Sequence, residues 1–416
     1  MCASAGRHIT DMTALQLLAW ILLAIGLQSL FAVAVIIWWR KPRGAMRATP
    51  VASLRTSAAA WDGLREFRVI ARTYEDPAQT QCSFALAPVD GAPLPPFKPG
   101  QFRTFSLAVD GPDAPARVIR CDSLSDTPDP ARYRITVKRA LPPPGKPDAP
   151  AGIVSGWLHD QAQLGTRLDV RAPSGQFFFV ADPDAPPVFI AGGIGITPML
   201  SMLKSALADQ PGRAAHLFYG VRNGQDHAFK ADLRQLADAH SGLTLHTLYA
   251  DPTQQDVQGG DYDLPGFISL DLLKQTLPHG RHAFYICGPD PMMKSLIPAL
   301  LGWGVAEADI HRESFGPQTA APTPAAFPVA GPALAIGFRR SGRTMDWVGR
   351  DANLLDFAER HSIPVDAGCR GGSCGTCETR LISGRVHYAA QPEFDVTSGN
   401  CLLCVATPAT ALELDA

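Results

Sequence analysis

The chain has 416 residues, enough for about three domains of ordinary size. It is 46% hydrophobic and 18% charged, which excludes a largely disordered protein. Its formal net charge of −2 at pH 7 lacks the basic excess that nucleic-acid-binding proteins carry, so no nucleic-acid partner is expected.

The first predicted element is a transmembrane helix over residues 14–39. This run of 26 residues has no formal charge. As a helix it would extend about 39 Å, more than the roughly 30 Å hydrocarbon core of a bilayer. Basic residues follow at once in Arg40-Lys41-Pro42-Arg43, which predicts a single-pass protein of the bacterial inner (plasma) membrane with its catalytic domains in the cytoplasm. A cleaved signal peptide and a buried helix of a soluble domain are the alternatives.

Residues 44–63 are polar and rich in alanine, and we predict a linker there. In residues 64–183 short apolar runs alternate with Pro and Gly breaks. Examples are residues 65–73, 101–109, 133–139 and 167–171. Short strands at this spacing, with turn signals between them, predict a small antiparallel β-barrel.

Residues 184–316 have the pattern of a parallel α/β domain. A short apolar run at residues 188–191 is followed by leucines at the spacing of a buried helix face, namely Leu200, Leu203 and Leu207. Further apolar runs lie at residues 216–219, 244–249 and 282–287, and helical stretches separate them. This alternation predicts βαβ units with a parallel sheet.

A glycine-rich turn lies between the first strand and the first helix of this domain, in Gly192-Gly193-Ile194-Gly195-Ile196-Thr197-Pro198. Its glycines would let the backbone approach a pyrophosphate, and the N-terminus of the helix would favour the negative charge. Thr197 can cap the helix, and Pro198 suits its first turn. An ordinary strand–helix turn is the alternative.

A second motif, Cys287-Gly288-Pro289, ends a strand at the same edge of the sheet, where ligands bind in open α/β folds. A small thiol at that point can lie against a nicotinamide ring without blocking it. A plain buried cysteine is the alternative interpretation.

Residues 317–332 consist mainly of Pro and Ala and predict a semi-rigid linker, so residues 333–416 form a separate domain. In that domain Cys369-x4-Cys374-x2-Cys377, followed by Cys404, has the spacing of a plant-type [2Fe–2S] site. Glycines in the same loop would let backbone N–H groups face the cluster. Arg370 would add a positive charge.

Two alternatives apply to this cysteine group. Zinc is the rival metal, although structural zinc sites usually pair two short Cys-x2–4-Cys segments. Cys401 is the rival fourth ligand, but the ending Cys404-Val405-Ala406 resembles that of ferredoxins, in which the cysteine before Val-Ala is the ligand. We therefore choose Cys404 and interpret Cys401 as a packed thiol.

The order of barrel, glycine turn and Cys-Gly-Pro strand end resembles the ferredoxin–NADP reductase superfamily. With a C-terminal ferredoxin domain, the chain is similar to the reductase components of oxygenases and to the hybrid-cluster-protein reductases. The barrel also resembles the reductase half of flavohaemoglobins. The resemblance covers roughly residues 64–416. It implies a multidomain chain behind the predicted transmembrane helix: an antiparallel β-barrel FAD domain, an α/β parallel-sheet NAD(P) domain and an α+β β-grasp ferredoxin domain.

The family's flavin motif, Arg-x-Tyr-Ser, matches Arg120-Cys121-Asp122-Ser123. The resemblance implies that Arg120 holds a flavin phosphate and that Ser123 hydrogen-bonds near the reactive N5. Residues 103–106 are a competing match, but they follow Pro99-Gly100-Gln101-Phe102, which precedes the motif strand in the family. Asp122 replaces the family tyrosine. Its negative charge should oppose flavin reduction, so we expect looser flavin binding or a lowered potential, unless Asp122 turns to solvent.

The sequence Gly152-Ile153-Val154-Ser155 matches the family's helix start that holds the flavin pyrophosphate, and it favours FAD over FMN. Glu313-Ser314-Phe315 ends the nucleotide domain and in the family closes the site beside the flavin. Glu313 would relay a proton or position the nicotinamide; a surface acid is the alternative. Asp251 stands where NADP-dependent members tend to have arginine, which favours NADH, while Arg222 keeps NADPH possible.

These features predict a membrane-anchored NADH-dependent reductase with Ser123, Cys287 and Glu313 as catalytic residues. Hydride would pass from NADH to FAD, and single electrons would then pass through the [2Fe–2S] cluster to an acceptor protein. An oxygenase, a desaturase, a haem protein or a hybrid-cluster protein would fit as this acceptor. Two alternatives stay open. One is an NADH:quinone or nitric-oxide-related reductase without a protein acceptor, and the other is a non-enzymatic redox-sensing membrane module that has lost its flavin.

Overall fold

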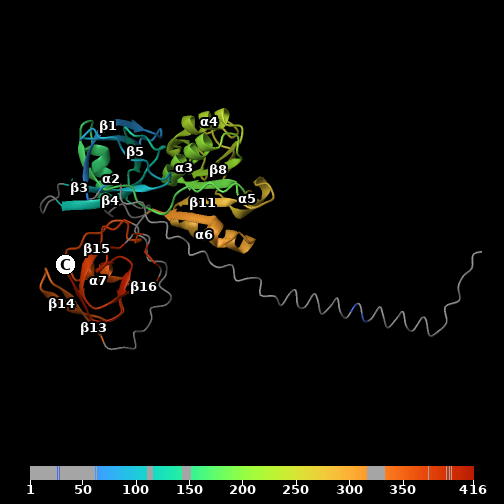
Figure 1. Ribbon diagram of the computed structural model, residues 1–416. Helices are drawn as coiled ribbons and strands as arrows, with labels where there is room; N and C mark the ends of the chain where they lie inside the picture. Colours follow the sequence, from blue (N-terminus) through green and yellow to red (C-terminus); the bar gives the residue numbers. More distant parts are fainter. Residues whose placement is uncertain are drawn as a thin grey trace, which may run out of the picture. The chain divides into compact units, whose positions relative to one another are not determined.

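The computed structural model describes residues 61, 63–109, 116–142, 151–315 and 333–416, the last range without 373, 390, 393 and 395, and in addition Gly26 and Gln28. The chain divides into two units, Met1–Ala58 and Ala59–Ala416. The second unit contains three large sheets and one two-stranded sheet with their helices (Figure 1).

The first sheet is antiparallel and has six strands in the order β4-β3-β6-β1-β2-β5. These strands are β1 (Arg65–Tyr74), β2 (Gln81–Pro88), β3 (Phe102–Val109), β4 (Ala116–Ser123), β5 (Tyr133–Lys138) and β6 (Arg167–Val170). A bridge between Leu124 and Ile135 joins the end of β4 to β5, so the two edge strands meet as in a barrel. Helix α2 (Ile153–Asp160) adds Val154 and Leu158 to the barrel core.

The alternation of residue types explains these strands. In β1, Phe67 and Val69 are buried, whereas Arg68 and Ile70 between and beside them are exposed. Successive side chains of a strand point to opposite faces, so this alternation places one face against the core. The antiparallel β-barrel predicted from the sequence matches this sheet.

The second sheet is parallel and has the order β10-β9-β8-β7-β11-β12. Its strands are β7 (Pro187–Gly192), β8 (Ala215–Val221), β9 (Leu243–Tyr249), β10 (Leu264–Pro265), β11 (Ala283–Gly288) and β12 (Ile310–Ser314). Every residue of β7 and β11 is buried, as expected of central strands covered on both faces.

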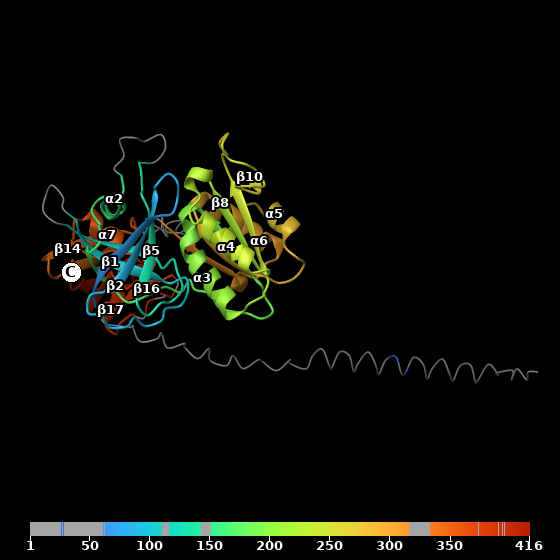
Figure 2. The same ribbon diagram turned by 90° about the horizontal axis from the view of Figure 1, so that it is seen from above.

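Four helices cover the two faces of this parallel sheet (Figure 2). Residues of α3 (Ile196–Asp209) and α4 (Lys230–Ala239) belong to one buried cluster, and residues of α5 (Leu270–Thr276) and α6 (Asp290–Trp303) belong to another. Three short 3-10 turns complete the domain: Gly193–Gly195, Gly224–Asp226 and Glu307–Asp309. The sequence prediction of a parallel α/β domain fits this arrangement.

The third sheet has the order β14-β13-β19-β15-β17 and mixes parallel and antiparallel pairs, while β16 and β18 form a small separate sheet. The strands are β13 (Leu334–Phe338), β14 (Arg343–Trp347), β15 (Glu378–Ser383), β16 (Val386–Tyr388), β17 (Asn400–Leu402), β18 (Ala406–Pro408) and β19 (Leu412–Leu414). Helix α7 (Leu354–Arg360) begins at an Asn353 cap and packs its leucines on the sheet core. This is the predicted β-grasp domain.

The transmembrane part of the predicted fold class is wrong. Within the part of the chain that the structure describes, no helix combines the length and the apolar character needed to cross a membrane. Of residues 14–39 only Gly26 and Gln28 are described, and the rest of the span and most of the 44–63 linker lie outside the description. The prediction depended on hydropathy and flanking charge alone. The predicted inner-membrane location, which depended on that helix, is corrected with it.

Candidate functional site

The glycine-rich turn after β7 lies against the Cys-Gly-Pro strand end after β11. A methyl group at Gly195 would overlap the carbonyl oxygen of Cys287, and one at Gly192 would lie 2.6 Å from Cδ of Pro289. A methyl group at Gly288 would lie 3.0 Å from Cα of Gly192. The two motifs predicted to bind the dinucleotide therefore touch, and their glycines are required because the two backbones pass so closely.

The turn leads into the N-terminus of α3. Gly195 precedes the helix and offers no side-chain cap, while the N–H of Ile196 bonds back to the Gly193 carbonyl in the 3-10 turn. A helix N-terminus without a side-chain cap suits an anion such as a pyrophosphate. Pro198 lies in the first turn, as predicted. Thr197 is not the cap: it lies inside the helix and its hydroxyl donates to the Ile194 carbonyl at 3.0 Å.

Three residues predicted to be catalytic converge where the barrel meets the nucleotide domain. The Ser123 hydroxyl, at the end of β4, donates to the Glu313 carboxylate at 3.3 Å. Glu313 lies on β12 directly beside Cys287 of β11 in the parallel register. Residues 190 positions apart in sequence are thus brought together at the carboxyl ends of β11 and β12.

The Cys287 side chain is fully buried at this point. Burial raises the pKa of its thiol well above the usual value, and the nearby Glu313 carboxylate raises it further. The group therefore stays a neutral thiol at physiological pH. A small uncharged side chain in this place leaves room for a planar ring.

Arg120, Cys121 and Asp122 lie on β4, the strand that carries the flavin motif. Arg120 is exposed and uses one nitrogen, Nη1, to donate to the carbonyl of Ile119 at 2.7 Å. The Cys121 sulfur lies 3.4 Å from the hydroxyl of Thr104 on β3. Burial raises the pKa of Asp122, the positive charge of Arg120 partly offsets this effect, and the resulting pKa is about 6.

The competing arginine, Arg103, is held in a different environment. Its side chain is 1% exposed, and its guanidinium lies 3.9 Å from the centre of the Tyr133 ring and 4.7 Å from that of Trp61. Nη1 donates to the carbonyl of Arg171 at 2.9 Å. This position within the barrel supports the choice of the exposed Arg120 as the phosphate ligand.

The second flavin motif begins helix α2. Gly152, which precedes the helix, makes no side-chain cap, and no acidic residue lies in the first turn. The Ser155 hydroxyl accepts from the backbone of Ala140 at 3.0 Å and donates to the Gly152 carbonyl at 3.1 Å. Ile153 is largely exposed and Val154 is buried. A helix start of this kind suits a pyrophosphate, because its N–H groups and dipole favour negative charge.

The cysteines of the ferredoxin domain lie in a loop whose backbone N–H groups point at sulfur. The N–H of Cys369 contacts the Cys374 sulfur at 3.3 Å, and that of Gly371 contacts the Cys369 sulfur at 3.4 Å. The N–H of Cys404 contacts the Cys377 sulfur at 3.4 Å. Such donors stabilise thiolate-bound clusters.

The conformation of this loop explains its glycines. Gly372 and Gly375 have φ angles of 77° and 71°, which favour glycine. Cys369 with Cys374 and Cys377 with Cys404 form two neighbouring pairs, the arrangement that two irons need. Among the described residues, no group of three or more His, Cys, Asp or Glu side chains is placed to hold a single metal ion. Four cysteine sulfurs in one loop region, with backbone N–H groups directed at three of them, fit a [2Fe–2S] cluster.

Arg370, predicted to add a positive charge to the cysteine loop, is also paired with carboxylates. Its guanidinium pairs with Glu359 and lies 3.7 Å from Asp356, both on α7. The arginine therefore ties the cysteine loop to the helix. Sequence reasoning missed this because the two carboxylates lie outside the cysteine motif.

Sequence reasoning also missed the residues that join the barrel to the nucleotide domain. Asp126 accepts from Lys204 of α3 at 2.9 Å, and its backbone carbonyl accepts from Ser201 at 2.7 Å. Gln81 of β2 donates to the carbonyl of Asp226 at 2.9 Å. These bonds hold Ser123 and Glu313 in reach of each other, but isolated polar residues carry no motif that would have revealed them.

Arg222 and Asp251, the two residues predicted to affect the choice between NADH and NADPH, form an ion pair. Arg222 and Asp251 lie 3.3 Å apart, and both side chains are about 70% exposed. The N–H of Asp251 also donates to the Arg222 carbonyl at 2.8 Å. The only arginine that the sequence offered to a 2′-phosphate is thus already paired with a carboxylate.

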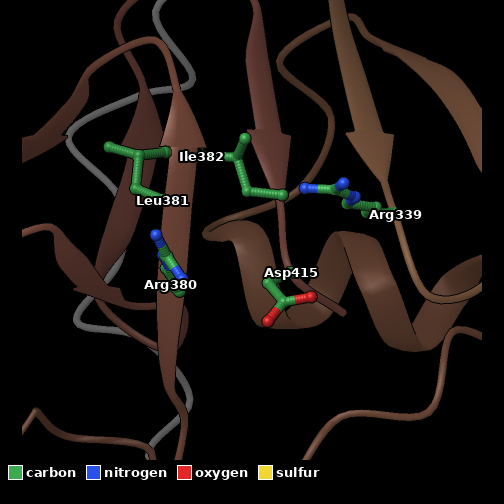
Figure 3. A pocket seen from close by; sticks show the side chains of 5 residues that line it. All are labelled: Arg339, Arg380, Leu381, Ile382 and Asp415. Carbon is green, nitrogen blue, oxygen red and sulfur yellow. The ribbon is translucent and has the colours of Figure 1, made fainter.

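Two cavities lie away from these motifs. One of about 150 Å³ lies on the ferredoxin domain between Arg339, Arg380 and Asp415, with Leu381 and Ile382 (Figure 3). Another of about 300 Å³ lies beside α4 and includes Lys230 and Tyr262. Neither includes a residue predicted to bind a cofactor.

Comparison with known proteins agrees with this arrangement. A family described as the oxidoreductase NAD-binding domain matches residues 189–296, and one described as the 2Fe-2S iron-sulfur cluster binding domain matches residues 338–409. A flavohemoprotein of Rhizobium meliloti (strain 1021) is 39% identical over 261 residues, which are 63% of this chain and 62% of the relative. A flavohemoprotein of Rhodopirellula baltica is 40% identical over 261 residues, 62% of each chain. The chain thus spans less than two thirds of the length of these curated relatives.

Two solved structures are also similar. The flavohem-like FAD/NAD binding domain of nitric oxide dioxygenase from Vibrio cholerae O1 biovar El Tor is 32% identical, with a TM-score of 0.54, over 61% of this chain and 100% of that chain. Phthalate dioxygenase reductase is 25% identical, with a TM-score of 0.50, over 85% of this chain and 98% of that chain. That protein is described as a modular structure for electron transfer from pyridine nucleotides to [2Fe-2S].

Proposed function

The chain belongs to the ferredoxin–NADP reductase superfamily and carries a [2Fe–2S] domain after its nucleotide domain, and from that premise we propose that it delivers electrons from NADH to an iron-containing acceptor protein. It is an NAD(P)H-dependent oxidoreductase, and its cofactors are FAD, NADH and a [2Fe–2S] cluster. The identity of the acceptor and the roles of single residues are proposals.

The observation that carries the proposal is the contact between Ser123 and Glu313. It joins the strand with the flavin motif to the strand beside the Cys-Gly-Pro motif. A nicotinamide held at Gly288 and a flavin held at β4 would therefore lie next to each other. Short separation and fixed orientation are what hydride transfer requires.

The proposed roles of the residues follow from their positions. Arg120 and the start of α2 bind the phosphates of FAD, and the glycine turn with the start of α3 binds the pyrophosphate of NADH. Cys287 leaves room for the nicotinamide ring, with Phe315 beside the site. Ser123 and Glu313 orient the two rings through their shared hydrogen bond. The flavin, when bound, accepts two electrons and passes them on one at a time.

Asp251 favours NADH over NADPH in this proposal. A 2′-phosphate would lie near its carboxylate, which repels it, and would have to separate Arg222 from that carboxylate to gain a cation. The ribose 2′-hydroxyl of NADH faces neither cost.

The acceptor is proposed to take electrons from the cluster held by Cys369, Cys374, Cys377 and Cys404. The similarity to phthalate dioxygenase reductase favours an oxygenase component, and the similarity to flavohemoproteins favours a haem protein. An acceptor with an iron centre satisfies both. A desaturase or a hybrid-cluster protein belongs to the same chemical class.

The test uses the full-length protein, with FAD and iron measured on the purified chain. Anaerobic addition of NADH should bleach the flavin and then produce the electron paramagnetic resonance signal of a reduced [2Fe–2S] cluster. Ser123→Ala should slow flavin bleaching about tenfold, the effect of one lost hydrogen bond of about 1 kcal/mol or slightly more. Ser125→Ala is the matched control, because the Ser125 hydroxyl contacts Thr136 at 2.9 Å and not the site. Bleaching without any cluster signal would contradict the proposed order of transfer.

A further inference from the structure

Asp122 is a carboxylate in the middle of the strand that carries the flavin motif. It lies two residues after Arg120, so the two side chains share one face of β4, and it directly precedes Ser123, which reaches Glu313 at 3.3 Å from the other face. The half-buried Asp122 carboxylate therefore has a Coulombic interaction with any charge that develops in the flavin site.

The positive charges around Asp122 are few. Its partner across the sheet is Arg103 on β3. That guanidinium lies against the rings of Trp61 and Tyr133 and donates to the backbone carbonyl of Arg171. Among the described side chains of its own strand, Arg120 is the charge that acts on it, and Glu313 of β12 contacts the adjacent residue, Ser123. Burial raises the pKa of Asp122 to about 6 despite Arg120.

The proposed function changes this balance further. Arg120 is the residue proposed to bind a flavin phosphate, and a phosphate would offset the one positive charge that favours the Asp122 carboxylate. Hydride transfer then leaves negative charge on the reduced flavin, which also opposes a second negative charge close by. Both effects make protonation of Asp122 more favourable.

We propose that Asp122 binds a proton from solvent when the flavin is reduced and releases it when the electrons leave for the cluster. This inference rests on the proposed flavin site at β4. The hydride of NADH brings two electrons and one proton, and Asp122 takes up a second proton. Both protons return to water as two one-electron steps reoxidise the flavin, so each NADH yields one net proton, two electrons and NAD⁺.

The consequence is a flavin potential that depends on pH. Without Asp122 protonation, a carboxylate beside the ring would oppose reduction at every pH. With it, the opposition is relieved as pH falls, because proton binding and electron binding favour each other by the same free energy. The aromatic residue of the family at this position cannot act in this way.

The experiment measures the two-electron midpoint potential of the flavin in the full-length protein by spectroelectrochemistry between pH 5.5 and 8.5. One extra proton per two electrons adds about 30 mV per pH unit to the slope. Asp122→Asn keeps the shape of the side chain but cannot titrate, and its slope should be shallower than that of the wild type by up to this amount above about pH 6. Asp129→Asn, a more exposed carboxylate in the turn after β4, is the matched control and should keep the wild-type slope.

FAD content is measured first, so that the outcomes are distinguishable. A wild-type chain that binds no FAD would overturn the proposed function and this inference together. Equal slopes in FAD-loaded wild type and Asp122→Asn would overturn only the inference. If Asp122→Asn fails to fold, Asp122→Tyr replaces it, and a slope as steep as that of the wild type in this variant would equally overturn the inference.

Discussion

Cys401 and Cys404 of the ferredoxin domain are three residues apart, and we predict different roles for them. The backbone N–H of Cys404 contacts the Cys377 sulfur at 3.4 Å. Cys401 is fully buried on β17, opposite Thr379 of β15, and Cys404 belongs to the same hydrophobic cluster, so the contact to Cys377 and not burial distinguishes the two thiols. A core thiol of this kind behaves as a small apolar side chain. These positions favour Cys404 as the fourth cluster ligand.

We therefore predict that Cys404→Ser loses the cluster. Iron content should fall from about two atoms per chain to near zero, because a hydroxyl is a poorer ligand than a thiolate. NADH-dependent reduction of ferricyanide through the flavin should continue. Cys401→Ala is the matched control and should keep its iron. If Cys401→Ala lost its iron and Cys404→Ser kept it, Cys401 and not Cys404 would be the fourth ligand.

Single residues also mark the limits of sequence reasoning. The cysteine spacing identified the cluster loop because its chemistry depends on local order in the chain. The pairing of Arg370 with Glu359 could not be predicted, since it depends on how α7 packs against that loop. The burial of Arg103 depends in the same way on Tyr133 and Trp61, which lie far from it in sequence.

At the level of elements, the strand ends of β7 and β11 form the most tightly constrained part of the nucleotide domain. Gly195 has φ −59°, which alanine also adopts, so the backbone alone does not require glycine there. The added methyl group would instead overlap the Cys287 carbonyl oxygen. The constraint is therefore steric and involves both strand ends.

We predict that Gly195→Ala raises the KM for NADH and lowers the free energy of unfolding by about 1–3 kcal/mol, the usual cost of overpacking. Gly302→Ala provides the comparison, because Gly302 lies in α6 of the same domain with open space around it. That substitution should raise the free energy of unfolding by about 0.5–1 kcal/mol, since alanine is the better helix former. Calorimetry and NADH titration of both variants test the pair, and equal behaviour would refute the steric argument.

Elements defined by periodicity were predicted well. The expected runs at residues 65–73 and 133–139 correspond to β1 (Arg65–Tyr74) and β5 (Tyr133–Lys138). Helix ends were predicted less well, because Thr197 looked like a cap but lies inside α3. The 3-10 turn Gly193–Gly195 leads directly into α3, which therefore begins at Ile196, before Thr197. The preference of threonine for the cap position does not predict this earlier start.

At the scale of the whole molecule, hydrophobic periodicity predicted the order of barrel and parallel α/β domain, and the resemblance to ferredoxins implied the β-grasp domain after them. The contacts that join the barrel to the nucleotide domain, such as Asp126 with Lys204, could not be predicted from local patterns. The transmembrane helix was inferred from hydropathy and flanking charge and was wrong, with no spanning helix among the described residues. The predicted domain boundaries stay predictions.

The pH dependence of stability is also a property of the whole chain, because buried histidines occur in several elements. Burial, with smaller contributions from His246 and His282, lowers the pKa of His216 to about 4, and burial lowers that of His227 to about 3. His216 is 8% exposed, and its Nδ1 has no hydrogen-bond partner among the described residues. Its ring stacks on that of His246 at 6.0 Å. These imidazoles are neutral in the folded protein.

We predict that stability is fully present above about pH 6.5 and falls as the pH is lowered toward 4. In that window the unfolded chain binds protons on histidines with pKa about 6.5, while the folded chain does not, so unfolding becomes more favourable. His216 alone would contribute a loss of at most about 3 kcal/mol.

His216→Gln cannot titrate and should lose less thermal stability than the wild type between pH 7.5 and 5. His279→Gln, at an exposed histidine before β11, should behave as the wild type. Calorimetric melting at the two pH values decides the matter, and an equal loss in His216→Gln and wild type would show that this imidazole is not a source of the acid sensitivity.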